Sequence, residues 1–358
     1  MPPVSFLDSY RLLGRSGLRV SPLALGTMTF GTDWGWGADE ETARSIFDMY
    51  VGLGGNFVDT ANVYTDGSAE RLLGNFAQGR RNSLVIATKY SLPPRTNDPN
   101  CGGNHRKSMI TSVEDSLRRL RADYIDLLYL HLWDFTTPTD EIARAMDDLV
   151  RAGKVLYLGI SNTPAWQIAK IQVTSTLRGF MPLIALQIEY NLLQRTPERE
   201  LIPAAQDLGL GIVSYSPLAE GLLSGKYTAA DLGTPTQRPP DGSRRNTVLS
   251  YGGWSKRCVP IVDAVAKVAH ELDRAIPQVA IAWLVQSAAV TSIIIGARTL
   301  GQFRDNLQAP YLQFTDAHRE QLSAASAVEL GYPHDFLAWA LKSDFMGRAM
   351  NLAGPHRP

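Results

Sequence analysis

The stretch EIARAMDDLVRAGKVLYLGIS, residues 141–161, decides the fold class. It has an amphipathic helical pattern over Glu141–Ala152, then Gly153, and then the apolar run Val155–Ser161. Glycine directly after a helical pattern is a common C-terminal stop of a helix, and a short apolar run is typical of a buried strand. The stretch therefore predicts a helix followed at once by a buried strand, which is the repeating unit of an α/β fold.

The same unit recurs along the chain, and the number of repeats predicts a closed barrel. Eight apolar runs resemble buried strands: Leu23–Leu25, Asn56–Asp59, Leu84–Thr88, Ile125–His131, Val155–Ser161, Ile184–Glu189, Gly211–Ser214 and Ser292–Gly296. Amphipathic stretches lie between them, at Thr42–Val51, Ser108–Leu120, Glu141–Ala152, Pro164–Ile171, Glu198–Leu208, Ile261–Leu272 and Pro277–Gln286. Strict alternation favours a parallel sheet, and eight strands favour a (β/α)8 TIM barrel.

An open doubly wound sheet is the alternative to a closed barrel. It would need a phosphate-binding glycine loop after its first strand, and the sequence has none there. Gly52-Leu53-Gly54-Gly55 precedes a strand instead, as a helix stop does. We therefore expect a single barrel domain over residues 1–358, with its core at about 23–308 and a C-terminal extension at about 315–358 that could cover the barrel mouth or meet a neighbouring subunit.

Two segments lie outside the repeating units. Tyr10–Leu13 and Leu18–Ser21 flank Gly14-Arg15-Ser16-Gly17, a pattern that predicts a β-hairpin able to plug the N-terminal end of the barrel. Pro217–Pro260 is a long segment rich in Gly, Pro, Ser and Arg between the seventh strand and its helix. Loops of this length are usually functional or mobile, and this one is suited to covering phosphates through its arginines, Arg238, Arg244 and Arg245.

Composition excludes several classes of protein. The 358 residues are 44% hydrophobic and 20% charged, as in a globular protein with a large core, and Lys+Arg balance Asp+Glu at 35 each. This neutral balance favours neither nucleic acid nor an anionic membrane as a partner. Two cysteines far apart in sequence fit a reducing compartment. Without a signal-peptide pattern or a long apolar run, we expect a cytoplasmic protein.

Four polar residues stand where the predicted strands end or their loops begin: Asp59, Tyr64, Lys89 and His131. In a barrel of this type the active site lies at the C-terminal ends of the strands. An acid, a phenol, an amine and an imidazole gathered there could make a phenol with an ordinary pKa near ~10 donate a proton at neutral pH. Three further polar residues fall at the same mouth: Ser161, Gln187 and Tyr215.

These residues carry a resemblance to a known family. The segment Gly55–Tyr64, with Asp and Tyr five positions apart, resembles the signature of the aldo-keto reductases. Lys89 and His131 match the remaining two catalytic positions of that family, and Gly153–Asn162 is similar to its nicotinamide-contacting strand. Within the family, the chain looks closest to the aryl-alcohol dehydrogenase-like branch because of two segments, Asn100–Lys107 and His131–Asp134.

The resemblance implies reversible, NADP(H)-dependent reduction of aldehydes and ketones. Hydride would pass from the reduced nicotinamide to the carbonyl carbon, and the oxygen would need a proton. Tyr64 would be the general acid, Lys89 would lower the pKa of Tyr64, Asp59 would pair with the lysine, and His131 would hydrogen-bond the carbonyl oxygen.

The resemblance also implies a set of cofactor residues. Ser161, Asn162 and Gln187 would hold the carboxamide, and Tyr215 would stack beneath the nicotinamide ring. The loop from Tyr215 to Lys226 would meet the diphosphate through Ser216, Pro217, Leu218, Gly221, Leu222 and Lys226. The remaining predicted contacts are Gly26, Thr27, Asp59, Gly296, Ala297, Arg298, Gln302 and Asn306. A guanidinium at the start of a helix suits the 2′-phosphate of NADP, and Arg298, Gln302 and Asn306 are spaced four apart.

Aromatic residues in the predicted mouth loops indicate the substrate class. We expect an apolar pocket for an aryl or extended carbonyl compound, lined by Phe30, Trp34, Trp36, Tyr64, Tyr90, His131 and Trp133. The expected partner is thus a small carbonyl or alcohol, with a homo-oligomer possible.

Two other classes of function remain open. A non-catalytic NADP(H)-binding sensor, like the potassium-channel β subunits, would keep the cofactor residues without efficient turnover. A non-redox barrel enzyme would want a metal cluster or paired carboxylates at the mouth, and the sequence suggests neither. A metal site is not expected, because none of the six histidines has a His or Cys partner at ligand spacing apart from Cys101 near His105.

Overall fold

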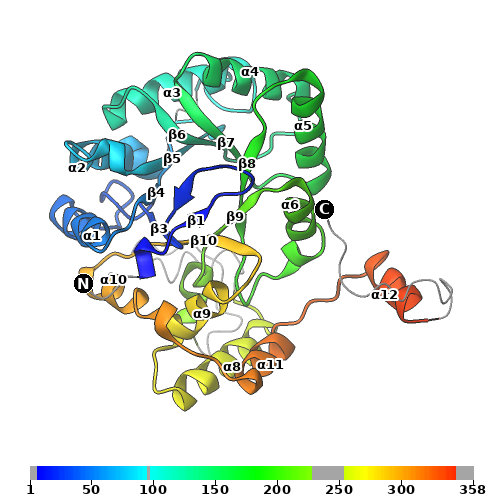
Figure 1. Ribbon diagram of the computed structural model, residues 1–358. Coiled ribbons are helices and arrows are strands. Elements are labelled where there is room, and N and C mark those ends of the chain that lie inside the picture. Colours follow the sequence, from blue (N-terminus) through cyan, green and yellow to red (C-terminus); the bar gives the residue numbers. More distant parts are fainter. Residues whose placement is uncertain (1–5, 95–96, 228–253, 344–358) are drawn as a thin grey trace.

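Eight parallel strands close into a barrel in the computed structural model, which describes residues 6–94, 97–227 and 254–343 (Figure 1). Around the barrel the strands run in the order β10-β3-β4-β5-β6-β7-β8-β9. Their bounds are β3 Leu23–Gly26, β4 Phe57–Asp59, β5 Val85–Tyr90, β6 Ile125–Leu130, β7 Val155–Ser161, β8 Leu183–Glu189, β9 Gly211–Tyr215 and β10 Val290–Ile295. The predicted (β/α)8 barrel is therefore confirmed, and every predicted strand overlaps an observed one.

Helices surround the barrel and separate successive strands (Figure 1). They are α1 Glu40–Gly52, α2 Ser68–Phe76, α3 Arg106–Leu120, α4 Thr139–Arg151, α5 Ala165–Arg178, α6 Leu201–Leu208, α8 Cys258–Glu271, α9 Ile276–Val285, α10 Leu300–Asn306, α11 Asp316–Ala325 and α12 His334–Lys342. Short 3-10 turns connect them, at η1 Phe6–Asp8, η2 Tyr64–Gly67, η3 Arg81–Ser83, η4 Thr196–Glu198, η5 Ala219–Ser224 and η7 Ala309–Tyr311. No described helix is both long and apolar enough to cross a membrane.

The sequence pattern missed α2 and the second half of α5. The buried face of α2 includes Glu70, which a hydrophobic pattern does not expect. Its carboxylate accepts hydrogen bonds from Thr88 Oγ1 at 2.6 Å and Arg119 Nε at 2.6 Å. In α5 the buried stripe continues through Ser175, so the apolar pattern stops before the helix does.

Alternate residues of each strand enter two separate cores. One core fills the barrel and includes Phe57, Ala87 and Tyr129, and the other packs the strands against the helices and includes Ile86 and Tyr90. In β5, Lys89 follows the inward Ala87 by two positions, and Tyr90 belongs to the outer core. This alternation, inherent to a pleated strand, decides which mouth residues can reach the barrel axis.

A hairpin closes the N-terminal end of the barrel, as predicted. Its strands are β1 Arg11–Leu12 and β2 Arg19–Val20, and Figure 1 shows them lying across the barrel opening. Leu13 and Val20 pack into the inner core. The Arg11 guanidinium donates to the carbonyl of Val290 at 2.9 Å, at the start of β10. The opposite end of the barrel is therefore the open mouth.

Two predicted features lie partly beyond the described residues. The long loop after β9 contains η5, but its residues 228–253, with Arg238, Arg244 and Arg245, lie outside them. The C-terminal extension contains α11, which packs on α8, and α12, which lies to the side of the barrel rather than over it (Figure 1). His334 Nε2 of α12 lies 2.9 Å from Glu200 Oε1.

Candidate active site

A buried ion pair forms the base of the mouth. Asp59 ends β4, and Lys89 lies on β5 beside it. The Lys89 ammonium, which is fully buried, donates to both carboxylate oxygens of Asp59, at 2.6 and 2.8 Å, and to the carbonyl of Thr60 at 2.7 Å. Burial alone would lower the pKa of Lys89, but the charges and hydrogen bonds of Asp59 and Tyr64 together outweigh burial, and the net shift is upward. Lys89 is therefore held as a cation.

Tyr64 meets this pair from the turn that follows β4. Lys89 Nζ lies 3.2 Å from the Tyr64 hydroxyl, and the Tyr64 ring stands edge-on to the His131 ring with their centroids 6.0 Å apart. Burial raises the pKa of Tyr64, and the Lys89 charge opposes that rise without cancelling it. Lys89 thus lowers the pKa of Tyr64 as predicted, but the net shift is upward because removal of the phenol from water has the larger effect.

His131 follows β6 and is neutral. Burial, together with the nearby Lys89 charge, lowers its pKa to about 3. Its Nδ1 is buried, and no group in the described part of the chain hydrogen-bonds to it. Asn162 Nδ2 donates to the His131 carbonyl at 2.9 Å, which fixes the backbone at this position. A neutral imidazole has one N–H donor and no charge, so His131 can hydrogen-bond an oxygen without titrating near neutral pH.

The predicted carboxamide-binding residues lie on adjacent strands. Ser161 at the end of β7 pairs with Gln187 of β8. Gln187 Nε2 donates to Asp59 Oδ2 at 2.9 Å, and the Tyr215 hydroxyl donates to Asn162 Oδ1 at 2.8 Å. The Ser161 hydroxyl is buried and has no hydrogen-bond partner among the described residues. An unsatisfied buried hydroxyl beside these residues fits a ligand with its own polar group, as a nicotinamide carboxamide has.

The predicted diphosphate loop follows Tyr215 and forms a cradle. Gly221 has φ 101°, a conformation that glycine adopts readily. A Cβ atom at Gly221 would lie 3.0 Å from Lys226 Nζ, so the ammonium borders the glycine backbone. Pro217 and Leu222 are buried, Leu218 packs against the outer core, and Ser216 is half-buried, so the loop is anchored from below. Exposed backbone and one cation are suited to a diphosphate.

The predicted 2′-phosphate residues surround the start of α10. Arg298 is exposed and precedes the helix, whose N-cap is Thr299, and its backbone N–H donates to Gln302 Oε1 at 3.1 Å. Asn306, in contrast, is buried at the other end of α10. Arg298 is thus a candidate to bind an anion at the start of this helix. Asn306 lies one helical turn beyond Gln302, further from that anion.

The remaining predicted cofactor residues lie between β3 and β10. A Cβ atom at Gly296 would lie 3.6 Å from the Gly26 carbonyl. Thr29 Oγ1 donates to the Ala297 carbonyl at 2.8 Å. Thr27 is fully buried, and both its N–H and its hydroxyl donate to the Asp59 carbonyl. The Thr27 side chain therefore holds the Asp59 backbone.

Three of the predicted substrate-pocket residues are placed elsewhere by the structure. Phe30 and Tyr90 are fully buried in the outer core, with the Phe30 ring 6.2 Å from Phe76 and the Tyr90 hydroxyl 3.4 Å from the Asn104 carbonyl. The prediction was wrong for both, because it treated nearness to the mouth as exposure and ignored the in–out alternation. Trp133, which is 5% exposed, is also buried in this outer core. The candidate aromatic wall is therefore reduced to Trp34 and Trp36, half-exposed with ring centroids 5.7 Å apart.

A polar clamp between two mouth loops was not predicted. The Asn104 backbone N–H donates to Asp134 Oδ2 at 2.7 Å, and the Asp134 N–H donates in return to Asn104 Oδ1 at 2.9 Å. Burial alone would raise the pKa of Asp134, but the backbone N–H donors of Asn104 and neighbouring residues lower it to about 2. Trp133 is therefore followed by an ionised carboxylate, that of Asp134, which is held in place by hydrogen bonds. The residues are 30 positions apart, so no local pattern pairs them.

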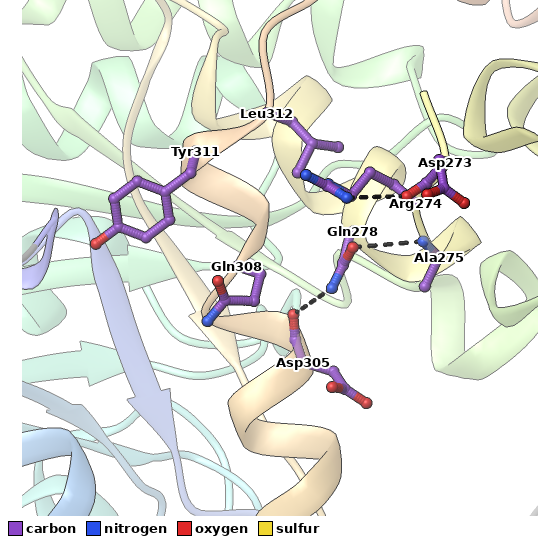
Figure 2. Close-up of a pocket in the computed structure, with 8 residues that line it drawn as sticks. All are labelled: Asp273, Arg274, Ala275, Gln278, Asp305, Gln308, Tyr311 and Leu312. Atoms are coloured by element: carbon purple, nitrogen blue, oxygen red, sulfur yellow. Dashed lines mark hydrogen bonds between the residues drawn. The ribbon is translucent and has the colours of Figure 1, made fainter. Parts of the chain in front are cut away.

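A separate groove lies on the outer wall, away from the mouth (Figure 2). It has a volume of about 580 Å³ and lies between α9, the end of α10 and η7. Its Gln278 side chain is satisfied at both ends, by the Ala275 N–H at 3.4 Å and the Asp305 carbonyl at 3.0 Å. The groove contains none of the polar residues at the strand ends, so we place the candidate site at the mouth. The described residues contain no cluster suited to a metal ion.

A (β/α)8 barrel with a Tyr–Lys–Asp–His group at its mouth defines a class of barrel enzymes, and comparison with known proteins identifies the family. The Aldo/keto reductase family model matches residues 22–327, so the chain belongs to the aldo/keto reductase family of oxidoreductases. The resemblance found in the sequence is thereby confirmed.

Curated relatives agree with this assignment over nearly their full lengths. The chain is 35% identical to an aryl-alcohol dehydrogenase of Pestalotiopsis microspora over 348 residues, which is 94% of this chain and 87% of the relative. It is 42% identical to an uncharacterized oxidoreductase of Bacillus subtilis, covering 84% and 90%. It is also 35% identical to an NADP(+) aryl-alcohol dehydrogenase of Phanerodontia chrysosporium, covering 93% and 89%.

Proposed function

We propose that this protein reduces aldehyde or ketone carbonyls with NADPH, and oxidises the alcohols in the reverse direction, with Tyr64 as general acid and base. The observation that carries the proposal is the contact of the Tyr64 hydroxyl with a buried lysine, 3.2 Å from Lys89 Nζ, beside a neutral His131. Membership of the aldo/keto reductase family supports carbonyl reduction. An NADP(+) aryl-alcohol dehydrogenase among the relatives supports both the cofactor and the substrate class.

The proton would come from Tyr64. When bound, the reduced nicotinamide supplies a hydride to the carbonyl carbon, and the oxygen becomes negative. Tyr64 gives its proton to that oxygen, and Lys89 stabilises the phenolate that remains. Without the ammonium, burial alone would make that phenolate costly. Asp59 holds Lys89 in place through both carboxylate oxygens.

His131 would orient the carbonyl. Because its pKa is about 3, the imidazole stays neutral under neutral conditions and does not compete with Tyr64 as a proton source. Its buried Nδ1 has no partner, so we assign the N–H to Nε2, on the side of the ring that remains for the substrate. One oxygen would then receive a hydrogen bond from His131 and a proton from Tyr64.

The cofactor residues fit NADP(H). The unsatisfied Ser161 hydroxyl would bind the carboxamide, and the Gly221–Lys226 cradle would bind the diphosphate. Exposed Arg298 at the start of α10 would contact the 2′-phosphate. We propose an aryl or extended carbonyl as substrate because the loop after β3 offers two half-exposed aromatic rings, Trp34 and Trp36.

The test is NADPH oxidation with a panel of aryl aldehydes, comparing wild type with Tyr64→Phe. We expect the variant to lose about 10²- to 10⁴-fold in kcat, the usual contribution of a positioned acid. Tyr124→Phe is the matched control, because Tyr124 lies away from the mouth and stacks on Arg81. Undiminished turnover in Tyr64→Phe refutes the proposed acid. Tight NADPH binding without turnover of any carbonyl by the wild type would instead favour a sensor.

A further inference from the structure

Ser91 has a backbone conformation that residues other than glycine rarely adopt. It directly follows β5, and its φ is 94°. A residue with a Cβ atom is strained there, and such strain persists only where the surrounding structure holds it in place. Glycine would relieve the strain, since it accepts positive φ at no steric cost. The serine side chain therefore needs a local explanation.

The hydroxyl of Ser91 is used completely. It accepts the backbone N–H groups of His131 and Leu132, each at 3.1 Å, and it donates to the carbonyl of Tyr90. The side chain is buried, so water does not replace these bonds. The Ser91 carbonyl in turn accepts the N–H of Gly103 at 2.8 Å. Ser91 thus connects the end of β5 with the turn that carries His131.

This connection extends the sheet beyond its regular ladder. The β5–β6 register ends with Lys89 opposite Tyr129 and Tyr90 opposite Leu130. His131 is the first residue after β6, and its N–H is shared between the Tyr90 carbonyl and the Ser91 hydroxyl. The hydroxyl therefore sets the position of His131 along the strand direction relative to Lys89, and so relative to Tyr64.

We propose that Ser91 is a positioning residue that holds His131 at the height where its imidazole and Tyr64 meet the same carbonyl oxygen. The inference rests on the proposed carbonyl reduction. Misplacement of a catalytic group by about 1 Å can cost on the order of 10²-fold in rate. The hydrogen bonds of Ser91 within the described residues go to backbone groups, including that of His131, so we assign its effect on the reaction to His131.

The experiment is a double-mutant cycle with Ser91→Gly and His131→Gln, read as kcat for an aryl aldehyde. Ser91→Gly removes the hydroxyl and also relieves the strained backbone, so loss of activity cannot come from added strain. We expect a 10- to 100-fold loss of kcat, on the order of the cost of misplacement, with the NADPH Kd unchanged. In the His131→Gln background the same change should cost no more than about twofold. Ser83→Ala is the matched control, because its exposed hydroxyl also donates to a nearby backbone carbonyl, that of Arg80 at 2.8 Å.

A second readout does not require turnover. NMR titration of the His131 ring should show it neutral down to pH 5 in the wild type, and in Ser91→Gly its pKa should move up toward the ordinary value. Equal losses of kcat in both backgrounds, with an unchanged His131 titration, would overturn the positioning role. If the wild type reduces no carbonyl but its His131 titration still shifts in Ser91→Gly, the proposed function fails while the positioning role stands.

Discussion

Removal of the Lys89 charge tests the buried ion pair most directly. In Lys89→Met the Asp59 carboxylate stays buried, and of its hydrogen-bond donors among the residues that the structure describes only Gln187 Nε2 remains, at 2.9 Å. Breaking a buried ion pair from one side costs about 3–5 kcal/mol, because an uncompensated charge stays in the interior. We expect a loss in that range from the free energy of unfolding, which for globular proteins is about 5–15 kcal/mol.

The double variant Lys89→Met/Asp59→Asn separates the charge from the packing. Asparagine keeps an oxygen that can accept the Gln187 amide, and neither partner is then charged. We expect the double variant to be at least ~2 kcal/mol more stable than Lys89→Met alone, a coupling typical of residues in direct contact. Urea unfolding followed by tryptophan fluorescence gives both values, provided that the slopes with urea are the same.

Two results would contradict this reasoning. One is a loss of less than about 1 kcal/mol in Lys89→Met, which is the range of an exposed ion pair. The other is a double variant no more stable than the single variant, which would mean that the lost lysine packing, rather than the stranded carboxylate, dominates. Lys267→Met, which removes an exposed ion-pair partner of Glu271, is the matched control and should change stability little.

Three further predictions follow from burial, charge and close approach. The pKa of His131 is lowered to about 3, so its contribution to stability is complete above the unfolded pKa near 6.5 and is lost as the pH falls. Wild type should therefore lose ~2 kcal/mol more than His131→Gln between pH 7 and 5, measured by urea unfolding. Arg298→Ala should raise the Kd for NADPH roughly 10- to 100-fold and leave NADH binding unchanged in fluorescence titration, while Arg304→Ala on α10 changes neither. Gly14→Ala should lower the free energy of unfolding, measured with urea, by about 2–4 kcal/mol. Gly14 has φ 59°, and a Cβ atom there would lie 2.3 Å from a backbone oxygen. Gly17→Ala is the control, because a Cβ atom at Gly17 meets nothing within 4 Å.

The barrel could be predicted because each strand is a bounded apolar run. The helices were predicted less well where polar residues are buried. Glu70 lies on the buried face of α2 and Ser175 on that of α5, so a search for periodic apolar residues does not find the full buried face of either helix. The position of α12 beside the barrel depends on contacts such as His334 with Glu200, which are far apart in sequence. Such contacts have no local signature.

The candidate site was predictable as a set of residues and less so in its energetics. The convergence of Asp59, Lys89 and Tyr64 follows from their places at strand ends. The exclusion of Tyr90 from the mouth could also have been predicted from the sequence. Adjacent residues of a strand point to opposite faces, so if Lys89 points into the barrel, Tyr90 points outward. The upward pKa shift of Tyr64 does not, because it is a balance between burial and a neighbouring charge. Ser91 carries no signal either, since a serine after a strand is ordinary.

The hairpin that closes the barrel has a consequence for the order of folding. Its Arg11 binds the carbonyl of Val290, which lies 279 positions later in the chain. The hairpin is made long before β10 and cannot complete its docking until β10 follows, and contacts this distant in sequence form slowly. Until β10 is in place, β3 and β9 are unpaired sheet edges, which are prone to association with other chains. Loss of the first twenty residues should accordingly increase aggregation during refolding more than it alters the mouth.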